Sequence, residues 1–416
     1  MFKPPSGRIA VMFLLFAVLF GTGQFHRVSS VIIMPELARE LGLAAGALGA
    51  ISGVYFLCAA AMQIPIGLAF DRHGARRTVP AVLLLSFAGT MIFATAHDVA
   101  GLVLGRALMG IGFASVLMGA YAVFARWVPM DRFSTVSALM IAIGSMGGML
   151  ATSPLAAAVV WIGWRDTIIA VGVMTVLLVI LTWAVVRDAP PGYVEVGRRP
   201  GNVRENLRGL VEAWRNRQMQ RVLAMGLATY GPGMALLGLW GGPFLADVHG
   251  LGPLARGNLL FAMALAGPLG LLVIGPLDRV FNSRRKVVLI FASSKAAAFA
   301  LLAVFADASL WLIGPLMVWV MFSQAYYVAV QSQCRAIFPD AMVGRATTSL
   351  NMAAVGGVAI MQFATGAIIA AFPPETGSAA IASLAGYRWV FAFVAVATAV
   401  AVLAYRGVED SAVRPD

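Results

Sequence analysis

A histidine and an arginine stand next to each other inside the first long apolar run of the chain. The stretch from Phe20 to Pro35 reads FGTGQFHRVSSVIIMP, and Gln24 precedes Arg27 by three positions. A spanning helix needs about 20 apolar residues, so a run that opens at Ile9 places Arg27 well inside the membrane. An ionised side chain there is expected to face a water-filled cavity or a partner rather than lipid. Arg27 is therefore a candidate anion ligand, with snorkelling or a structural pairing as the alternative.

His26 is the second group in this run that could do chemistry. It is the only histidine within the apolar runs, and histidine alone has an ordinary pKa close to neutrality. A proton on His26 could accompany an anion on Arg27, which would give symport. Consecutive helical residues point about 100° apart, so both can face a wide cavity without contacting one ligand. A neutral histidine bonded to a neighbouring helix is the competing interpretation.

The composition shows what surrounds these two residues. Hydrophobic residues make up 60% of the chain, charged residues 12%, and the mean hydropathy is +0.87, which indicates an integral membrane protein. The net charge of +12 does not indicate nucleic-acid binding, because the basic residues are gathered in short segments between apolar runs. The first run lacks a small-residue cleavage site and is expected to stay as a helix. Cys58 and Cys334 lie apart within apolar runs and form neither a disulfide framework nor a metal site.

No catalytic triad, phosphate-binding loop or metal-binding cluster is recognisable in the sequence, so an enzyme, a cofactor and ATP-driven transport are not expected. Charged and Pro/Gly-rich breaks instead predict an all-α membrane protein with twelve transmembrane helices. The predicted spans are 9–35, 47–70, 79–96, 99–124, 134–161, 167–186, 221–246, 254–277, 287–305, 309–333, 346–371 and 388–405.

The distribution of basic residues predicts the orientation. With both termini cytoplasmic, most of the 30 basic residues fall in inner segments, and the outer segments hold only Arg39, Arg165, Arg256 and Arg388. Arg27, Arg106 and Lys295 lie inside spans, where none of the 18 acidic residues falls, and such uncompensated charge favours an anionic guest. The compact loops and strong bias favour a bacterial inner membrane.

The chain divides into two similar parts. Residues 1–187 and 221–416 are expected to form two six-helix halves, joined by a cytoplasmic linker, 188–220, that ends in an amphipathic helix. GLAFDRHGARR recurs as GPLDRVFNSRRK, ARWVPMDR as CRAIFPDAMVGR, and GWRD as GYRW. Three echoes in the same order predict parallel repeats related by an axis along the membrane normal.

The first of these echoes carries a family resemblance. GLAFDRHGARR resembles the loop signature of the major facilitator superfamily, Gly-x-x-x-Asp-Arg-x-Gly-x-Arg-Arg or Lys. This resemblance implies two pseudo-symmetric halves with a central site and alternating access. The resemblance also implies a charged latch that breaks when the inner side opens, formed by Asp71, Arg72 and Arg76 with Asp278, Arg279 and Arg284. An ordinary basic loop is the alternative to this resemblance.

The fourth and fifth spans carry further family features. LGRALMGIG is similar to the fourth-helix motif, in which the arginine, here Arg106, is associated with coupling; a structural arginine bonded to helix-end carbonyls is equally compatible with it. Gly110 and Gly112 are expected to pack closely. The efflux signature of the fifth helix is only half present, because Met149, Thr152 and Ser153 replace its proline and glycines.

Arg27 followed by Pro35 resembles the first helix of organic-anion and organophosphate transporters. The seventh span offers Tyr230 and no arginine, which suits a carboxylate better than a phosphate. Nitrate is disfavoured, because the second span lacks the arginine of nitrate carriers. Lys295, in a span that is peripheral by resemblance, is interpreted as a snorkelling or structural lysine.

Polar residues inside the spans complete the candidate site, although each alone is more often an interhelical hydrogen bond. Tyr326, Tyr327 and Gln331 are expected to share one face of the tenth span. The predicted substrate-binding residues are Gln24, His26, Arg27, Tyr55, Arg106, Tyr230, Tyr326, Tyr327 and Gln331, and further polar candidates are Gln63, Asn258, Gln324, Asn351 and Gln362.

The sequence thus predicts a monomeric secondary transporter that imports a small organic anion, a carboxylate by preference, with a proton. A proton-coupled exporter of drugs or hydrophobic metabolites is the first alternative, and the lack of an intramembrane carboxylate weighs against cationic drugs. A membrane scaffold or sensor on the same fold is the second, and it predicts that Arg27 and the latch are dispensable.

Overall fold

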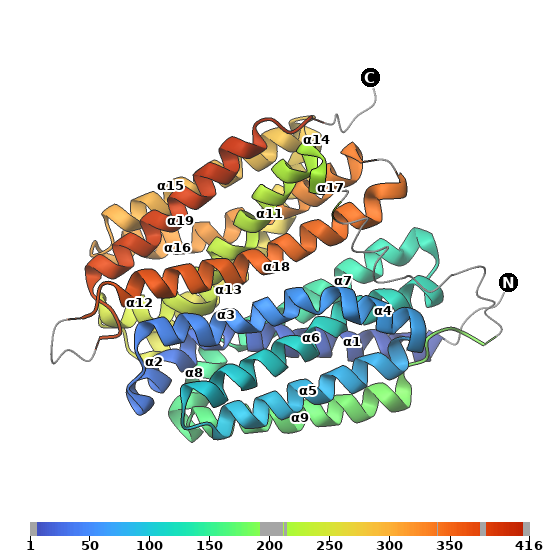
Figure 1. The fold of residues 1–416 in the computed structure, drawn as a ribbon, viewed down its shortest axis with the longest axis horizontal. Coiled ribbons are helices and arrows are strands. Elements are labelled where there is room, and N and C mark those ends of the chain that lie inside the picture. The colour runs from blue at the N-terminus through green and yellow to red at the C-terminus, as the bar shows by residue number, and fades with distance from the viewer. Residues whose placement is uncertain (1–5, 192–210, 212–213, 339, 375–379, 411–416) are drawn as a thin grey trace.

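Helices are the only regular elements among the residues that the computed structural model describes, which are 6–191, 211, 214–338, 340–374 and 380–410 (Figure 1). The first bundle contains α1 (Ser6–Val28), α2 (Ser30–Leu41), α3 (Ala45–Ala61), α4 (Gln63–His73), α5 (Ala75–Thr95), α6 (Val99–Trp127), α7 (Met130–Leu150), α8 (Ser153–Ile162) and α9 (Trp164–Val185). The second contains α11 (Arg217–Ala235), η1 (Leu236–Trp240), α12 (Gly241–Asp247), α13 (Pro253–Ile274), α14 (Leu277–Val280), α15 (Arg284–Val304), α16 (Leu310–Ser323), η2 (Gln324–Tyr326), α17 (Tyr327–Ile337), α18 (Asp340–Ala370) and α19 (Leu384–Tyr405).

These helices make twelve spans. Ten continuous helical segments are long and apolar enough to cross a membrane, and two bent pairs, α3 with α4 at 43° and α7 with α8 at 40°, bring the number to 12. The predicted twelve-helix architecture is therefore confirmed. The first span is longer than predicted, because the helix continues past Pro35 to Leu41, and the eleventh begins earlier, at Asp340. Most of the predicted linker, including its amphipathic helix, lies outside the described residues.

Local signals in the sequence set where the helices begin and turn. The side chains of Asp98, Ser309 and Ser383 accept hydrogen bonds from the first backbone amides of α6, α16 and α19, which would otherwise have no partner within the helix. Gly74 and Gly163 adopt positive φ angles of 74° and 83° at the tight turns before α5 and α9. Such turns keep consecutive spans antiparallel and adjacent.

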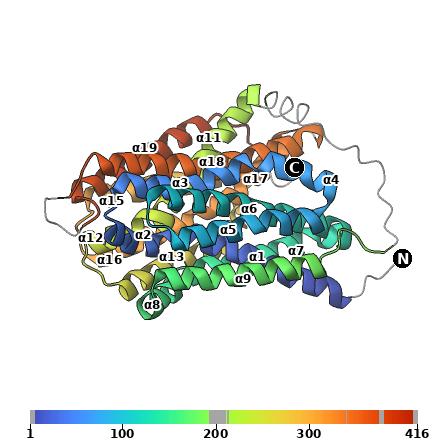
Figure 2. The ribbon, with the colours of Figure 1, turned by 60° about the horizontal axis from the view of Figure 1, so that its bottom comes forward.

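The two bundles lie against each other with their long axes aligned (Figures 1 and 2). The first residues of α1 and the last of α19 lie at the same end of the molecule, which we call the termini end (Figure 1). The opposite end, where α2 and α12 lie, is called the far end.

The bundles meet closely toward the far end. A Cβ atom added to Gly49 on α3 would lie 2.7 Å from the Cα of Gly366 on α18, so only glycine allows this approach. Gly242 on α12 packs in the same way against the carbonyl of Val31 on α2. Pro35 has no N–H group to donate to that carbonyl, which leaves it available to the other bundle.

Polar contacts join the bundles along the same seam. Ser153 on α8 lies 2.8 Å from the amide oxygen of Asn258 on α13, and the guanidinium of Arg256 lies 3.7 Å from the carboxylate of Glu36. The side chain of Arg256 is only 4% exposed, whereas that of Glu36 is partly exposed. The described structure is therefore closed at its far end.

Candidate functional site

Arg27 lies where the two bundles meet, in the last turn of α1. Its Nη1 donates a hydrogen bond of 3.0 Å to Oε1 of Gln24, one turn earlier on the same helix. The hydroxyl groups of Tyr55 on α3 and Tyr230 on α11 reach the same guanidinium as hydrogen-bonding partners. All partners of Arg27 in the described chain are neutral, and its Nε has none. The positive charge is therefore unpaired, as the sequence predicted.

Tyr55 is positioned by the close approach of α3 and α6. A Cβ atom on Gly110 would lie 2.1 Å from the backbone carbonyl of Tyr55, so the predicted packing glycine is confirmed here. Tyr55 is fully buried, and its hydroxyl lies 3.5 Å from the carbonyl of Gly23. Packing against α6 thus holds Tyr55 in place beside Arg27.

Arg106 lies over the ring of Tyr55. Its guanidinium carbon is 4.9 Å from the centre of the Tyr55 ring, and its Nη1 donates a hydrogen bond of 2.7 Å to the carbonyl of His26. The residue is 2% exposed. Arg106 therefore supports the end of α1, which is the arrangement expected of a structural arginine.

His26 points away from the seam. Its ring is wholly buried and lies 5.1 Å from the Phe113 ring and 5.8 Å from the Phe25 ring. Neither ring nitrogen has a hydrogen-bond partner among the described residues. A proton-binding role for His26 stays a prediction, and in this arrangement no acceptor among those residues would stabilise the charged ring.

The three predicted residues of the tenth span do not share one face. Tyr327 lies near Tyr230 and Tyr121, with Gln331 one turn further along as its side-chain partner. Tyr326 instead turns into its own bundle and is fully buried. The physical reason is that consecutive helical residues point about 100° apart, so only Tyr327 and Gln331, four residues apart, share a face, and Tyr326, the last residue of the 3-10 segment η2, does not.

Lys295 on α15 is wholly buried, so the snorkelling interpretation is wrong. Its Nζ donates hydrogen bonds of 2.9 Å to the carbonyl of Thr229 and 3.3 Å to Oε1 of Gln324. The structural interpretation accounts for these bonds.

The other polar candidates form hydrogen bonds between helices. Asn351 donates to Gln63 across the seam at 3.0 Å, and Gln362 donates to the carbonyl of Met234 at 3.4 Å. Together with the Ser153–Asn258 contact, these bonds are the interhelical hydrogen bonds expected of isolated polar residues in membrane helices.

The predicted latch residues lie in two loops at the termini end, each within its own bundle. Asp71, Arg72 and Arg279 are exposed, and Arg284 lies 3.8 Å from Asp278. Arg76 contacts the carbonyl of Trp183 at 3.4 Å, and its backbone amide donates to Asp188. A joint latch between the two loops therefore stays a prediction for another state of the molecule.

The sequence analysis missed a repeated feature at these loops. Asp188 accepts a hydrogen bond of 3.0 Å from the amide of Arg76 at the start of α5, and Asp410 accepts one of 3.3 Å from the amide of Arg285 at the start of α15. Each aspartate ends a Val-x-Asp sequence just after the last helix of its bundle, at Val186 and Val408, and both valines are fully buried. This fourth echo was readable in the sequence as VRD and VED.

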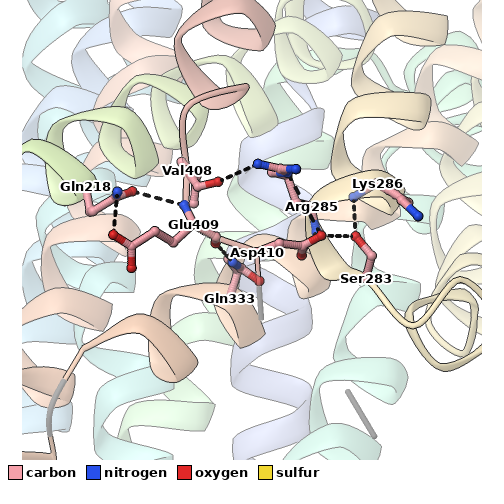
Figure 3. Close-up of polar contacts among 8 residues, drawn as sticks. All are labelled: Gln218, Ser283, Arg285, Lys286, Gln333, Val408, Glu409 and Asp410. Atoms are coloured by element: carbon pink, nitrogen blue, oxygen red, sulfur yellow. Dashed lines mark hydrogen bonds and ion pairs between the residues drawn. The ribbon is translucent and has the colours of Figure 1, made fainter. Parts of the chain in front are cut away.

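The segment from Val408 to Asp410 links three helices of the second bundle (Figure 3). Asp410 faces Ser283 and Arg285 beside α15, and Glu409 faces Gln218 on α11. The backbone carbonyl of Glu409 accepts a hydrogen bond from Gln333 on α17. The end of the last span thus holds the termini end of this bundle together.

The family model described as "Major Facilitator Superfamily" matches residues 11–362. The chain belongs to the major facilitator superfamily. It is accordingly a membrane transporter and not an enzyme. A bacterial homologue of the human lysosomal transporter Spinster, solved in an inward-facing and unoccupied conformation, has the same fold, with a TM-score of 0.78 over 97% of both chains at 18% identity.

Curated relatives of this superfamily protein include carriers of anions and of drugs. It is 25% identical over 205 residues to the probable sulfoacetate transporter SauU of Cupriavidus necator, an alignment that covers 47% of each chain. It is 27% identical over 171 residues to the probable L-galactonate transporter of Escherichia coli, covering 41% of this chain and 37% of the relative. A quinolone resistance transporter of Acinetobacter baumannii is 24% identical over 155 residues, 36% of each chain. The chain thus matches less than half the length of each of these relatives.

Proposed function

We propose that this superfamily member imports a small organic anion, a carboxylate by preference, together with a proton. The observation that carries the proposal is Arg27, which lies where the bundles meet and has only neutral partners in the described chain. A guanidinium presents a planar fork of donors that matches a carboxylate in a bidentate manner. The relatives named for sulfoacetate and L-galactonate support an organic anion.

In this proposal the anion binds between the halves, 1–187 and 221–416, which rock against each other to expose the site to one side at a time. Arg27, Gln24, Tyr55 and Tyr230 contact the anion, and Tyr327 with Gln331 contribute from the tenth span. The two latch loops would come together when the termini end closes. The charge distribution supports cytoplasmic termini in a bacterial inner membrane.

The test is a thermal-shift panel on purified protein with acetate, sulfoacetate, L-galactonate, phosphate, nitrate and a cationic quinolone. A ligand at one hundred times its dissociation constant stabilises the folded state by about 2.7 kcal/mol, which is readily detected. Wild type is expected to be stabilised by at least one organic anion, and Arg27→Gln by none. Arg406→Gln removes an exposed charge outside the spans and serves as the matched control.

The opposite outcome favours export. If the quinolone stabilises the protein, the organic anions do not, and Arg27→Gln behaves as wild type, the anion proposal fails. The exporter alternative, to which the quinolone resistance relative belongs by name, then replaces it.

A further inference from the structure

The second bundle contains a buried titratable group that binding of the anion does not use. Lys295 is 0% exposed, and its Nζ contacts the carbonyl of Thr229 on α11 and the amide oxygen of Gln324 on η2. It also lies 5.7 Å from the centre of the Tyr326 ring. Three oxygen or ring contacts favour the charged ammonium, while burial opposes it.

The site around Lys295 is specifically shaped. A Cβ atom on Gly233 would lie 1.9 Å from Oε1 of Gln324, so only glycine lets that oxygen reach Lys295. No carboxylate contacts Lys295 within the part of the chain that the structure describes. The titratable groups on the helices around α15 are Arg217, Arg221 and Tyr230 on α11, Tyr326 on η2, Tyr327, Cys334 and Arg335 on α17, Tyr387, Arg388 and Tyr405 on α19, and Asp278 and Arg279 on α14; α16 has none.

Consecutive residues of α11 link Lys295 to the anion site. Thr229 accepts the hydrogen bond from Lys295, and Tyr230 reaches the guanidinium of Arg27. The same helix contains Pro232, which cannot donate to the carbonyl of Ala228, and then passes into the π-helical segment η1. A movement of this weakened part of α11 would change the surroundings of both cations.

We infer that Lys295 is the proton-binding group that couples proton movement to the anion at Arg27; the inference rests on the proposed function. With the site empty, Arg27 and Lys295 both contact α11, through Tyr230 and Thr229, and neither has a carboxylate partner among the described residues, which disfavours the proton on Lys295. A bound anion offsets this charge and favours that proton. By reciprocity, the proton on Lys295 strengthens anion binding by the same factor.

The proton step balances without any further reactant. When the anion leaves, and α11 moves so that water reaches Lys295, its ammonium gives its proton to that water, forming a neutral amine and hydronium. A new anion and a new proton then bind from the other side. Each cycle therefore moves one anion with one proton.

The experiment measures the affinity of the protein for acetate, sulfoacetate and L-galactonate from pH 6 to pH 9, a range in which these anions stay ionised. Wild type is expected to bind about tenfold more weakly at pH 9, a coupling of ordinary size. Lys295→Arg keeps the charge and should bind tightly at every pH. Lys295→Gln should bind as weakly at every pH as wild type does at pH 9. Lys286→Arg, an exposed lysine at the start of the same helix, is the control.

Proteoliposomes give a second readout that a purely structural lysine would not change. Lys295→Arg should still exchange internal for external anion, while an acid gradient no longer drives accumulation. If Lys295→Gln does not fold, the Arg variant and this transport assay carry the test alone.

Two results overturn the inference. In the first, Lys295→Arg retains the pH dependence of wild type and accumulates anion under an acid gradient. In the second, His26→Asn removes the pH dependence while Lys295→Arg does not, which places the proton on His26. If none of the three anions binds wild type at any pH, the proposed function itself has failed, and the inference falls with it.

Discussion

Each bundle buries a cation against a tyrosine ring, and the two arrangements differ in the cation, which is an arginine in the first bundle and a lysine in the second. In the first bundle Arg106 stacks on Tyr55 and donates to the carbonyl of His26, in the first span. In the second, Lys295 stacks on Tyr326 and donates to the carbonyl of Thr229, in the seventh span. Each cation therefore binds the backbone of the first long helix of its bundle, Arg106 that of α1 and Lys295 that of α11.

The internal repeat does not explain this likeness, because Arg106 lies on the fourth span and Lys295 on the ninth. The chemical difference is that arginine stays protonated in proteins, whereas a buried lysine can lose its proton. In the proposal above, the first bundle thus has a fixed charge beside the anion, and the second has a charge that the loss of a proton removes. The comparison predicts that the first cation sets affinity and the second sets pH dependence.

Arg106→Met tests the fixed charge and should have the largest effect. The variant removes the shorter of two side-chain hydrogen bonds to the buried carbonyl of His26, leaving the 3.3 Å one from the Ser29 hydroxyl, and it also removes the support for Tyr55. We expect organic-anion affinity to fall by about thirtyfold or more, equivalent to about 2 kcal/mol, together with a lower melting temperature. Isothermal titration and thermal unfolding measure the two effects.

The matched control is Arg106→Lys, which keeps a donor for the carbonyl. It should bind anions well at pH 6 and lose affinity as the pH rises, because the first bundle would then contain a titratable cation too. Wild-type affinity in Arg106→Met would show that Arg106 only fills space.

Paired tyrosine variants sharpen the comparison with a smaller effect. Tyr55→Phe removes a hydroxyl that reaches Arg27 and should weaken anion binding about three- to tenfold, the usual net value of one hydrogen bond of about 0.5–1.5 kcal/mol. Tyr326→Phe keeps the ring that stacks on Lys295 and should bind as wild type does. Equal losses in the two variants would show that both tyrosines contact the anion.

The sequence predicts the spans well because each needs only a long apolar run between charged breaks. It also identifies Arg27, whose charge within such a run demands a partner, and the neighbours Gln24, Tyr55 and Tyr230. What it cannot supply is the rotation of each helix about its axis. Lipid is as apolar as the protein interior, so the hydrophobic pattern does not show which face of a membrane helix points inward.

Lys295 and Tyr326 show the consequence of that missing information. Both lie in spans whose apolar residues surround the helix, and the i to i+4 rule pairs Tyr327 with Gln331 but does not place Tyr326, which points about 100° away from Tyr327. The Val-x-Asp echo, by contrast, was missed although it is printed in the sequence, because two short matches carry meaning only once both aspartates are seen to accept from the amides that open α5 and α15.

An ion pair at the far end supplies the smallest effect and the baseline for every pH experiment on the two cations. The Glu40 carboxylate accepts hydrogen bonds from Arg165 and Trp164, and these hold the pKa of Glu40 below its ordinary value of 4.5. A carboxylate whose pKa is lowered on folding stabilises the protein above its unfolded pKa, and that contribution is lost as the pH falls through the folded pKa. Because the pair is largely exposed, we expect less than about 1 kcal/mol. Glu40→Gln should thus melt slightly below wild type at pH 7, and the two melting temperatures should converge as the pH falls below the lowered pKa of Glu40. A difference that persists in acid would show that Glu40 acts through packing. If the difference in melting temperature between wild type and Glu40→Gln changes between pH 6 and pH 9, charges near Glu40 affect stability in the pH range used to test Lys295. The variants of Arg106 and Lys295 would then have to be compared in the Glu40→Gln background.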